Sequence, residues 1–501
     1  MNLLALPLIL PVAFALLGVA LRNRACGRRA IGVLSALALP AAALPVLMEV
    51  IGGDIAHLAA GNWRAPFGIV LVADLTAAIF LITAAFTACL VFFHVLLNPM
   101  RGALEKWFFP LANFVMLGVN GSLLTGDLFN LFVWFEVMLI GSFVMLILGG
   151  KRAQLEGGLK YVVINLVGSG FFLGGVAMLY GITGTLNYAD IAVKIQLLDE
   201  PAFAHSGVLL LFGAFAIKAG LFPFFFWLPA AYHTPPAVVT AFFGGLLSKV
   251  GIYAFYRTSS LFLADGFAPW QNLMLWAAAL TMITGVLGAA AHFHMRRILT
   301  FHIISQIGYI MAGVAMFTVA GLAAGLFYFI HNNVAKTNLL LISAVVERKR
   351  GTSRLDRVGG LYKAAPWLSI WFLISALALA GIPPLSGFWA KLGIVRAGIE
   401  GGFGWLVLAG LAVGMMTLFS MTKLWAEAFW KKEPEPGGWE DEEERGPVTR
   451  LGLAPVVAMV GIILALSFAG GAVFDVCNAA ASQLLDPAGY IRTVLGGEVE
   501  P

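Results

Sequence analysis

Apolar runs separated by short polar segments make up almost the whole chain. Fourteen of them reach about 18 residues, the length that a helix needs to cross a bilayer. They cover residues 3–21, 30–50, 68–96, 107–124, 128–149, 158–182, 204–228, 236–257, 271–291, 297–319, 321–346, 366–396, 404–429 and 450–475. Because each backbone polar group in hydrocarbon needs a partner within its own segment, helices are expected. The pattern predicts an all-α polytopic membrane protein with about 14 transmembrane helices.

Composition supports this class and excludes others. Apolar residues make up 60% of the chain and charged residues 11%, whereas a soluble domain carries about 25% charged residues. The net charge of +5 would suggest a nucleic-acid partner only if basic residues formed one water-facing cluster, and they do not. The three cysteines, Cys26, Cys89 and Cys477, are too widely spaced for a metal-binding motif. No nucleic acid and no metal are therefore expected.

The basic residues predict the orientation of the helices. Of the 31 Lys and Arg, 21 lie in or beside the odd-numbered loops and 5 lie on the opposite side. Since Lys and Arg near helix ends prefer the cytoplasmic side, both termini are predicted to face outward from the plasma membrane. The other five are lysines inside predicted spans: Lys218, Lys249, Lys336, Lys391 and Lys423.

Two segments between spans have a distinct character. Residues 185–200 are amphipathic but too short to cross a bilayer, so they are predicted to lie along the interface. Residues 431–447 form a charged segment with Pro and Gly on the predicted cytoplasmic side. We interpret this segment as a solvated linker, with a partner-docking role as the alternative.

Two predicted spans share an interruption. Residues 218–223 (KAGLFP) and 380–391 (AGIPPLSGFWAK) each combine an Ala-Gly step with proline and lysine, five spans apart. This offset is typical of inverted-topology repeats, whose broken helices lie beside a substrate path. It predicts repeats of spans 4 to 8 and 9 to 13, with helices 7 and 12 broken. The predicted divisions are N-terminal helices 1–106, first repeat 107–258, second repeat 271–430, and a C-terminal part 431–501 with the charged loop and helix 14.

The main candidate chemistry begins with Glu136, the one acid that lies well inside a predicted span. A charge at the bilayer centre costs at least about 2.5 to 3.5 kcal/mol on insertion scales, so it needs a compensating partner. Lys218 lies at a similar depth in span 7. Such a pair titrates as a unit, and protonation of the glutamate would release the lysine. We interpret the pair as a proton switch; the alternative is a structural ion pair.

Three further lysines extend this set. Lys249 has no acid in its span, Lys336 follows Asn332 and His331 at about one turn, and Lys391 follows the prolines that interrupt span 12. With Glu136 and Lys218 they form a predicted mid-depth proton relay, although each lysine could instead have a hydrated structural role. Weaker candidates follow, each with an interfacial or structural alternative: His233, His302, His331 and Lys423. Asp74, near the outer end of span 3, is interpreted as an interfacial anchor, with a cation-entry carboxylate as the alternative.

No P-loop, GxGxxG fingerprint, HExxH motif or haem-type ligand set occurs in the sequence. Neither ATP hydrolysis nor redox chemistry can therefore be placed on this chain, and no cofactor or catalytic residue is expected. The chain is predicted to act in transport rather than as an enzyme. Its energy would come from an ion gradient or from partners.

Several stretches resemble a known family. They are residues 118–150 (GVNGSLLTGDLFNLFVWFEVMLIGSFVMLILGG), 216–254 (AIKAGLFPFFFWLPAAYHTPPAVVTAFFGGLLSKVGIYA), 299–309 (LTFHIISQIGY), 330–340 (IHNNVAKTNLL) and 380–394 (AGIPPLSGFWAKLGI). These stretches are similar to the antiporter-like proton-translocating subunits shared by respiratory complex I and the Mrp cation/proton antiporters. Within that family, the chain most resembles the D-type branch of the multisubunit Mrp Na+/H+ antiporters.

The resemblance implies a fourteen-helix fold with two inverted five-helix repeats. It also implies that Glu136, Lys218, Lys249 and Lys391 form the proton path, while Lys336 and His331 are carried over less firmly. The implied function is Na+/H+ antiport within a hetero-oligomeric membrane complex, whose small subunits and A-type subunit would be the partners. Alternatives are a proton-pumping subunit of an NADH:quinone oxidoreductase or membrane-bound hydrogenase, a stand-alone transporter of an organic solute, and a structural scaffold.

Overall fold

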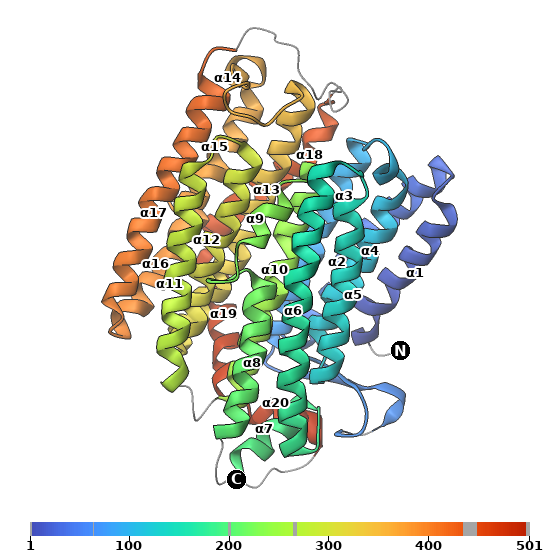
Figure 1. Ribbon diagram of the computed structural model, residues 1–501, viewed down its shortest axis with the longest axis vertical. Coiled ribbons are helices and arrows are strands. Elements are labelled where there is room, and N and C mark those ends of the chain that lie inside the picture. Colours follow the sequence, from blue (N-terminus) through green and yellow to red (C-terminus); the bar gives the residue numbers. More distant parts are fainter. Residues whose placement is uncertain (1–2, 64, 199–201, 264–267, 434–447, 497–501) are drawn as a thin grey trace.

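The structure is a computed structural model that describes residues 3–63, 65–198, 202–263, 268–433 and 448–496. Helices dominate it (Figure 1). The longer helices are α1 (Leu6–Leu21), α2 (Ala25–Val50), α3 (Leu75–Leu97), α4 (Ala103–Leu124), α5 (Leu128–Ile147), α6 (Arg152–Thr183), α8 (Ala202–Ala219), α10 (Ala237–Phe262), α11 (Ala268–Ala291), α12 (Met295–Met316), α13 (Val319–Arg350), α15 (Pro366–Ala380), α16 (Ser386–Glu400), α17 (Gly404–Trp425), α18 (Ala454–Phe468) and α19 (Gly470–Leu485). The shorter elements are η1 (Leu3–Ala5), β1 (Ala56–Ala59), η2 (Ala60–Asn62), β2 (Val70–Ala73), α7 (Tyr188–Gln196), α9 (Trp227–Tyr232), α14 (Leu361–Ala364), η3 (Ala426–Trp430), η5 (Leu451–Leu453) and α20 (Ala488–Leu495).

The predicted all-α membrane class is confirmed. In the described part of the chain, twelve helices are long and apolar enough to cross a membrane. The expected count of about 14 differs from this by two elements. The helix α13 has 32 residues but carries several polar side chains, and the predicted span 366–396 is divided into α15 and α16, each of 15 residues. The predicted charged loop 431–447 lies outside the described residues from position 434 onward.

Two helices end inside the bundle in the same way. The helix α8 ends at Ala219 and α15 ends at Ala380, and each is followed by a glycine with positive φ, Gly220 (76°) and Gly381 (89°). Each glycine N–H bonds back to a carbonyl of the last helical turn, as does the N–H of the next residue. Such a left-handed residue closes a helix C-terminus and suits glycine, which has no Cβ. These are the interruptions that the sequence predicts in spans 7 and 12; the inverted-repeat relation and the domain limits stay predictions.

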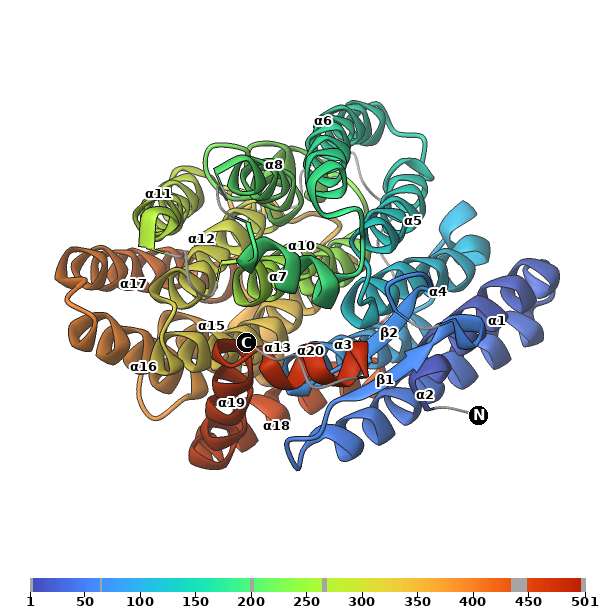
Figure 2. The ribbon, with the colours of Figure 1, turned by 90° about the horizontal axis from the view of Figure 1, so that it is seen from below.

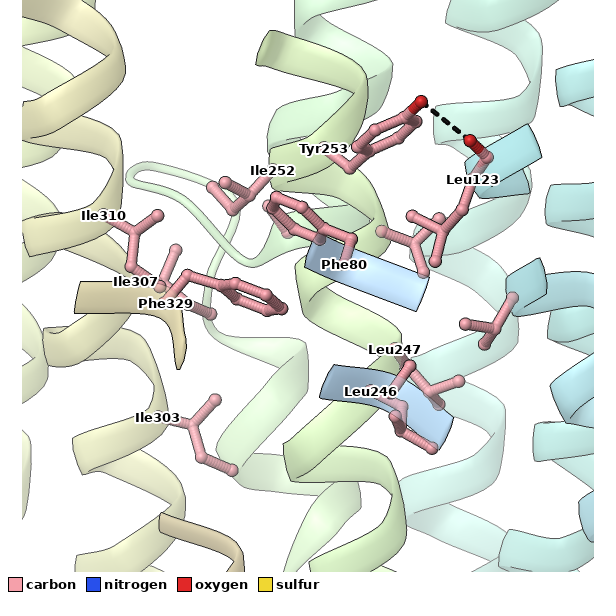
Figure 3. Packing of buried hydrophobic residues seen from close by; sticks show 14 of the residues in the cluster. Phe80, Leu123, Leu246, Leu247, Ile252, Tyr253, Ile303, Ile307, Ile310 and Phe329 are labelled. Carbon is pink, nitrogen blue, oxygen red and sulfur yellow. Dashed lines mark hydrogen bonds between the residues drawn. The ribbon is translucent and has the colours of Figure 1, made fainter. Parts of the chain in front are cut away.

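The helices α10 and α13 form the centre of the bundle. All of the residues of α10 are buried, and α13 contacts α3, α10, α12, α15, α16, α18 and α19. Figure 3 shows apolar side chains of α10 and α12 packed together beside Phe80 of α3, whose ring stacks on Phe329 of α13 with centroids 3.9 Å apart. The polar side chains in the middle of these two helices are therefore held away from the surface of the chain.

One end of the molecule carries small elements that cover the ends of the long helices. The strands β1 and β2 form an antiparallel hairpin, and η1 and α20 contact β1 (Figure 2). The predicted interfacial segment 185–200 forms α7 over residues 188–196, and α20 packs on it. The predicted start of span 3 at residue 68 is wrong, because residues 70–73 pair with β1 and the helix begins at Leu75. The beginning of α1 and α20 therefore lie at the same end of the molecule.

Candidate functional site

Glu136 and Lys218 form the predicted contact between α5 and α8. The Lys218 Nζ lies 3.6 Å from Glu136 Oε1, and the lysine side chain is buried while the glutamate side chain is 25% exposed. Ser169 of α6 donates a hydrogen bond of 2.5 Å to the same carboxylate oxygen. The carboxylate is thus held by one cation and one hydroxyl. A lysine that is buried but only loosely paired is an unusual arrangement, and such groups at membrane depth mark functional sites.

The broken end of α8 explains the position of Lys218. This lysine belongs to the last turn of α8, where the unsatisfied carbonyl groups carry the negative end of the helix dipole. Trp227 Nε1 donates to the carbonyl of Ile217 at 3.0 Å, which fixes the chain after the break. The Lys218 Nζ also lies 5.8 Å from the centre of the Phe135 ring. The dipole, the ring face and Glu136 therefore compensate the ammonium charge together.

Lys249 is buried in α10 and turns to its own helix, where Nζ donates to the carbonyl oxygen of Gly244. The helix carrying it lies close to the Glu136–Lys218 pair. A Cβ at Gly251, two residues after Lys249, would lie 2.8 Å from the backbone nitrogen of Ala219, which follows Lys218. The glycine therefore permits close contact between α10 and the broken end of α8.

Lys336 continues the set on α13, which packs against α10. It is fully buried, and its Nζ lies 3.5 Å from the carbonyl oxygen of Leu299 in α12. The charges of Lys249 and Lys336 lie within electrostatic range of each other. His331, on the same helix, contacts Ser386 of α16 through Nδ1 at 2.8 Å. Lys336 and His331, one turn apart on α13, thus contact two different helices, α12 and α16.

His302 lies between the lysines of the second half. Its Nε2 is 2.5 Å from Ser420 Oγ, and this hydroxyl donates to the carbonyl of Thr417 at 3.1 Å. Because a hydroxyl has one hydrogen, Ser420 must accept from the Nε2–H of His302. The Nδ1 lone pair is then buried without a partner among the described residues, and both Lys336 and Lys391 lie within electrostatic range of the ring. The Nδ1 of His302 is therefore free to accept a hydrogen bond or a proton.

Lys391 occupies the second helix break. Its Nζ donates to the carbonyl oxygen of Ala380, the last residue of α15, at 2.7 Å. The same ammonium lies 5.2 Å from the centre of the Tyr309 ring. Tyr309 stacks on Tyr328, whose ring is nearly perpendicular to that of His331. The geometry resembles that at Lys218, because in both places a lysine ammonium lies at the C-terminal end of an interrupted helix with an aromatic ring beside it, although Lys391 is only half-buried.

His233 lies at the end of α9, on the side of the molecule that carries α14. Its Nδ1 lies 2.6 Å from the carbonyl oxygen of Pro229, so this nitrogen carries the hydrogen, and Nε2 accepts from Arg297 at 3.1 Å. Burial and the charge of Arg297 lower the pKa of His233 to about 4. The ring is therefore neutral at pH 7, and a proton can pass through it only if these contacts change.

Lys423 lies at the edge of the bundle. Its Nζ donates to the carbonyl oxygens of Ala290 and His292, at 2.9 and 2.7 Å, and lies 3.8 Å from the Phe293 ring centre. Glu427, one turn after Lys423, pairs with Lys431 at 3.1 Å. Lys423 thus caps the end of α11 and is separated from the central lysines by its contacts.

A second buried ion pair escaped the sequence analysis. Arg257 of α10 donates to both carboxylate oxygens of Asp74, at 2.9 and 2.7 Å, and both side chains are buried. Asp74 also caps α3 by accepting from the N–H of Ala77. Asp74, interpreted from the sequence as an interfacial anchor, is instead buried against Arg257. The predicted end of the span 236–257 is also too early, because α10 continues to Phe262. The sequence contained a signal for this pair, because Arg257 lies at the end of an apolar span and a buried charge needs a partner of opposite charge.

Comparisons with known proteins identify relatives of this chain. Residues 125–417 match the family described as NADH:quinone oxidoreductase/Mrp antiporter, TM. The chain is 41% identical to the D subunit of the Na+/H+ antiporter of Alkalihalophilus pseudofirmus and 37% identical to that of Bacillus subtilis, with 99% of each chain covered. A chain of the Mrp complex of a Dietzia species superposes with a TM-score of 0.91 at 32% identity, covering 99% of both chains.

More distant structures have the same fold. A chain of the archaeal membrane-bound sulfane sulfur reductase gives a TM-score of 0.90, and one of respiratory complex I from Thermus thermophilus gives 0.81, each at 26% identity over 99% of this chain and the whole of the other. The matched region contains both broken helices and the four lysines Lys218, Lys249, Lys336 and Lys391. The chain therefore belongs to the NADH:quinone oxidoreductase/Mrp antiporter family of membrane subunits.

Proposed function

We propose that this chain is the proton-translocating subunit of an Mrp-type Na+/H+ antiporter. The observation that carries the proposal is the Glu136–Lys218 pair at the first helix break. Relatives that bear the name of the D subunit of a Na+/H+ antiporter, aligned over almost the full length, support the choice of ions. The chain is proposed to take part in transport, specifically in the exchange of Na+ against protons driven by an ion gradient.

The proposed relay begins with a proton on Glu136. Neutralising the carboxylate removes the counter-charge of Lys218 and leaves its ammonium held only by the helix end and an aromatic ring. The charge state of Lys218 then acts on Lys249 across the close α8–α10 contact. From Lys249 the coupling continues to Lys336, His302 and Lys391, which follow one another within electrostatic range. The relay uses repulsion between like charges in a low dielectric, where such effects are strongest.

Buried polar groups without protein partners lie beside this line. Among the described residues they include Asn332, Thr337 and the Nδ1 of His302. Buried polar groups are normally hydrogen-bonded, and internal water commonly supplies the bond. These groups therefore suit a hydrated path that links the lysines. His331 and Lys423 are proposed as secondary members of the proton path. His233 is proposed as a group through which protons pass between water and the path.

The chain is proposed to act inside a hetero-oligomeric complex in the plasma membrane, with small membrane subunits and a larger A-type subunit. The end with α14 is proposed to face the cytoplasm and the end with α7 and α20 the outside, as the distribution of Lys and Arg predicts. A change of charge in this chain would bias cation movement at a partner interface, which is a coupling between two sites.

The second candidate function is proton pumping in a redox-driven membrane complex. It is favoured by the fold shared with chains of sulfane sulfur reductase and complex I. Purification of the native complex separates the two: small antiporter subunits support the antiporter, whereas iron–sulfur or flavin subunits support the redox-driven complex.

The relay is tested by Glu136→Gln and Lys218→Ala in the complete complex. Each variant should abolish Na+-dependent collapse of a ΔpH in membrane vesicles while the complex still assembles. The matched control is Glu400→Gln, which alters an exposed acid paired with Arg396 on the surface of α16 and should leave antiport unchanged. Normal antiport in either relay variant would refute the proposed role.

A further inference from the structure

The helix α17 contacts the second half of the proposed relay, although it carries none of the main groups of that relay. Those groups lie on α5, α8, α10, α12, α13 and α16, and α17 contributes Lys423 as a secondary member. The helix packs against α11, α12, α15 and α16. It therefore lies beside the two helices that carry His302 and Lys391, and its inward-facing residues can act on both.

Two contacts bring α17 close to Lys391. Tyr309, whose ring lies beside the Lys391 ammonium, donates a hydrogen bond through its hydroxyl to the carbonyl oxygen of Gly410. One turn later on α17, a Cβ added at Gly414 would lie 3.4 Å from Lys391 Nζ and 3.7 Å from the hydroxyl oxygen of Tyr309. The backbone of α17 therefore passes close to the ammonium group before the helix continues toward His302.

Ser420 makes the contact between α17 and His302. Both side chains are fully buried, and Ser420 Oγ lies 2.5 Å from Nε2 of the ring. The same hydroxyl donates its one hydrogen to the carbonyl oxygen of Thr417 at 3.1 Å, so Nε2 must carry the hydrogen in the contact with His302. The hydrogen bonds of a neutral imidazole determine which of its nitrogens is protonated. The serine therefore selects the tautomer of the histidine.

The tautomer decides whether the ring can take up a proton. A neutral imidazole has one donor nitrogen and one acceptor nitrogen, so the acceptor is Nδ1 when Nε2 carries the hydrogen. The Nδ1 of His302 has no hydrogen-bond partner among the described residues, and both Lys336 and Lys391 lie within electrostatic range of the ring. In the opposite tautomer the acceptor would be Nε2, and the serine hydroxyl would occupy it. The tautomer that Ser420 selects is thus the one that leaves an acceptor available.

We propose that Ser420 is a positioning residue, which holds His302 with its hydrogen on Nε2 and so keeps Nδ1 available to accept a proton in the second half of the relay. In this step a neighbouring lysine ammonium gives one proton to Nδ1. The lysine becomes a neutral amine, and the ring becomes an imidazolium whose Nε2–H stays bonded to the serine. The inference rests on the proposed antiport function and adds α17 to the structures that support it.

The test compares three substitutions in the complete complex. Ser420→Ala removes the acceptor for Nε2–H, and Na+-dependent ΔpH collapse per assembled complex should slow roughly tenfold. Ser420→Thr keeps a hydroxyl, which in a helix can also bond to a carbonyl three or four residues earlier, and it should restore most of the rate. The matched control is Ser35→Ala on α2, where an equally buried serine bonds to carbonyl oxygens of its own helix. This control should leave the rate unchanged.

A spectroscopic measurement separates positioning from packing. The nitrogen chemical shifts of the imidazole ring distinguish a nitrogen that carries hydrogen from one that does not. They are measured by solid-state NMR on the histidine-labelled complex, and the signals of His302 are those that are missing in His302→Gln. The unsubstituted complex and Ser420→Thr should show a hydrogen-bonded Nε2–H, and Ser420→Ala should lose the hydrogen bond.

Loss of this hydrogen bond together with slower antiport in Ser420→Ala, and recovery of both in Ser420→Thr, would support the inference. Hydrogen on Nδ1 of His302 in the unsubstituted complex would overturn it, as would equal antiport in Ser420→Ala and Ser35→Ala. The NMR measurement needs no transport, so it tests the contact independently of the proposed function. Failure of that function would instead appear as normal antiport in Glu136→Gln.

Discussion

Lys391 Nζ lies 2.7 Å from the carbonyl oxygen of Ala380, and this contact joins a charged side chain of α16 to the C-terminal end of α15. The contact exists because Gly381 turns the chain out of the helix and exposes the last carbonyls inside the bundle. A helix end carries about half a negative charge, so it can hold an ammonium without a carboxylate. The lysine can therefore lose its proton without leaving a buried acid unpaired.

This relationship predicts the effect of Lys391→Arg. Arginine preserves the positive charge at the helix end but does not deprotonate in proteins. If proton transfer requires a neutral state of residue 391, antiport should fall by about 100-fold or more while the complex assembles normally. The measurement is Na+-dependent ΔpH collapse per assembled complex in vesicles. Arg396→Gln on the exposed face of α16 is the control; near-normal antiport in Lys391→Arg would show that a fixed charge is sufficient.

A second prediction concerns Ser169→Ala. The hydroxyl of Ser169 donates to the Glu136 carboxylate, and hydrogen bonds to charged groups contribute about 1.5 to 3 kcal/mol. Its loss should slow antiport by roughly tenfold or more through a poorly oriented carboxylate. Ser169→Thr should restore the rate.

Ser142→Ala supplies the matched control for that experiment. Ser142 is another buried serine of the same region, but its hydroxyl bonds to Tyr161 at 2.7 Å and not to Glu136. Equal slowing in Ser169→Ala and Ser142→Ala would assign the effect to packing rather than to the carboxylate.

The helices and the Glu136–Lys218 contact could be predicted from the sequence, because both depend on the hydrophobicity and charge of individual segments. A run of apolar residues needs a helix in hydrocarbon, and a lone buried acid needs a cation at its own depth. The broken helices were also predictable, since proline and glycine interrupt spans 7 and 12 at residues 220–223 and 381–384. In each case the residues that decide the feature are close in sequence or lie at the same depth in the membrane.

The remaining features depend on packing between distant segments. The partners of Lys336 and Lys391 are backbone carbonyls. Every residue has such a carbonyl, so residue types in the sequence cannot identify these partners. Asp74 and Arg257 are separated by 183 positions, and their pairing requires the contact of α3 with α10. The hairpin of β1 and β2 has strands of four residues each, too short for alternation to be recognised.

A third prediction concerns acid stability. The pKa of His233 is lowered to about 4 in the folded protein, whereas an unfolded chain has a histidine pKa of about 6.5. Between these values the unfolded state binds more protons, so stability falls as pH decreases from about 6.5 to about 4. His233→Gln should remove this contribution and flatten the dependence. The check is the thermal unfolding midpoint of the complex across this pH range; an unchanged slope would contradict the assignment.

The last prediction concerns Asp74 and Arg257, which should stabilise the fold rather than move protons. Removing one partner leaves the other charge buried and unpaired, which costs about 3 to 5 kcal/mol, whereas replacing both avoids that cost. Asp74→Asn and Arg257→Gln should each lower the thermal unfolding midpoint, and the double variant should recover part of the loss. Antiport per assembled complex should remain in all three. Strictly additive destabilisation would indicate that the two side chains act independently, because a coupled pair gives a double-mutant interaction energy.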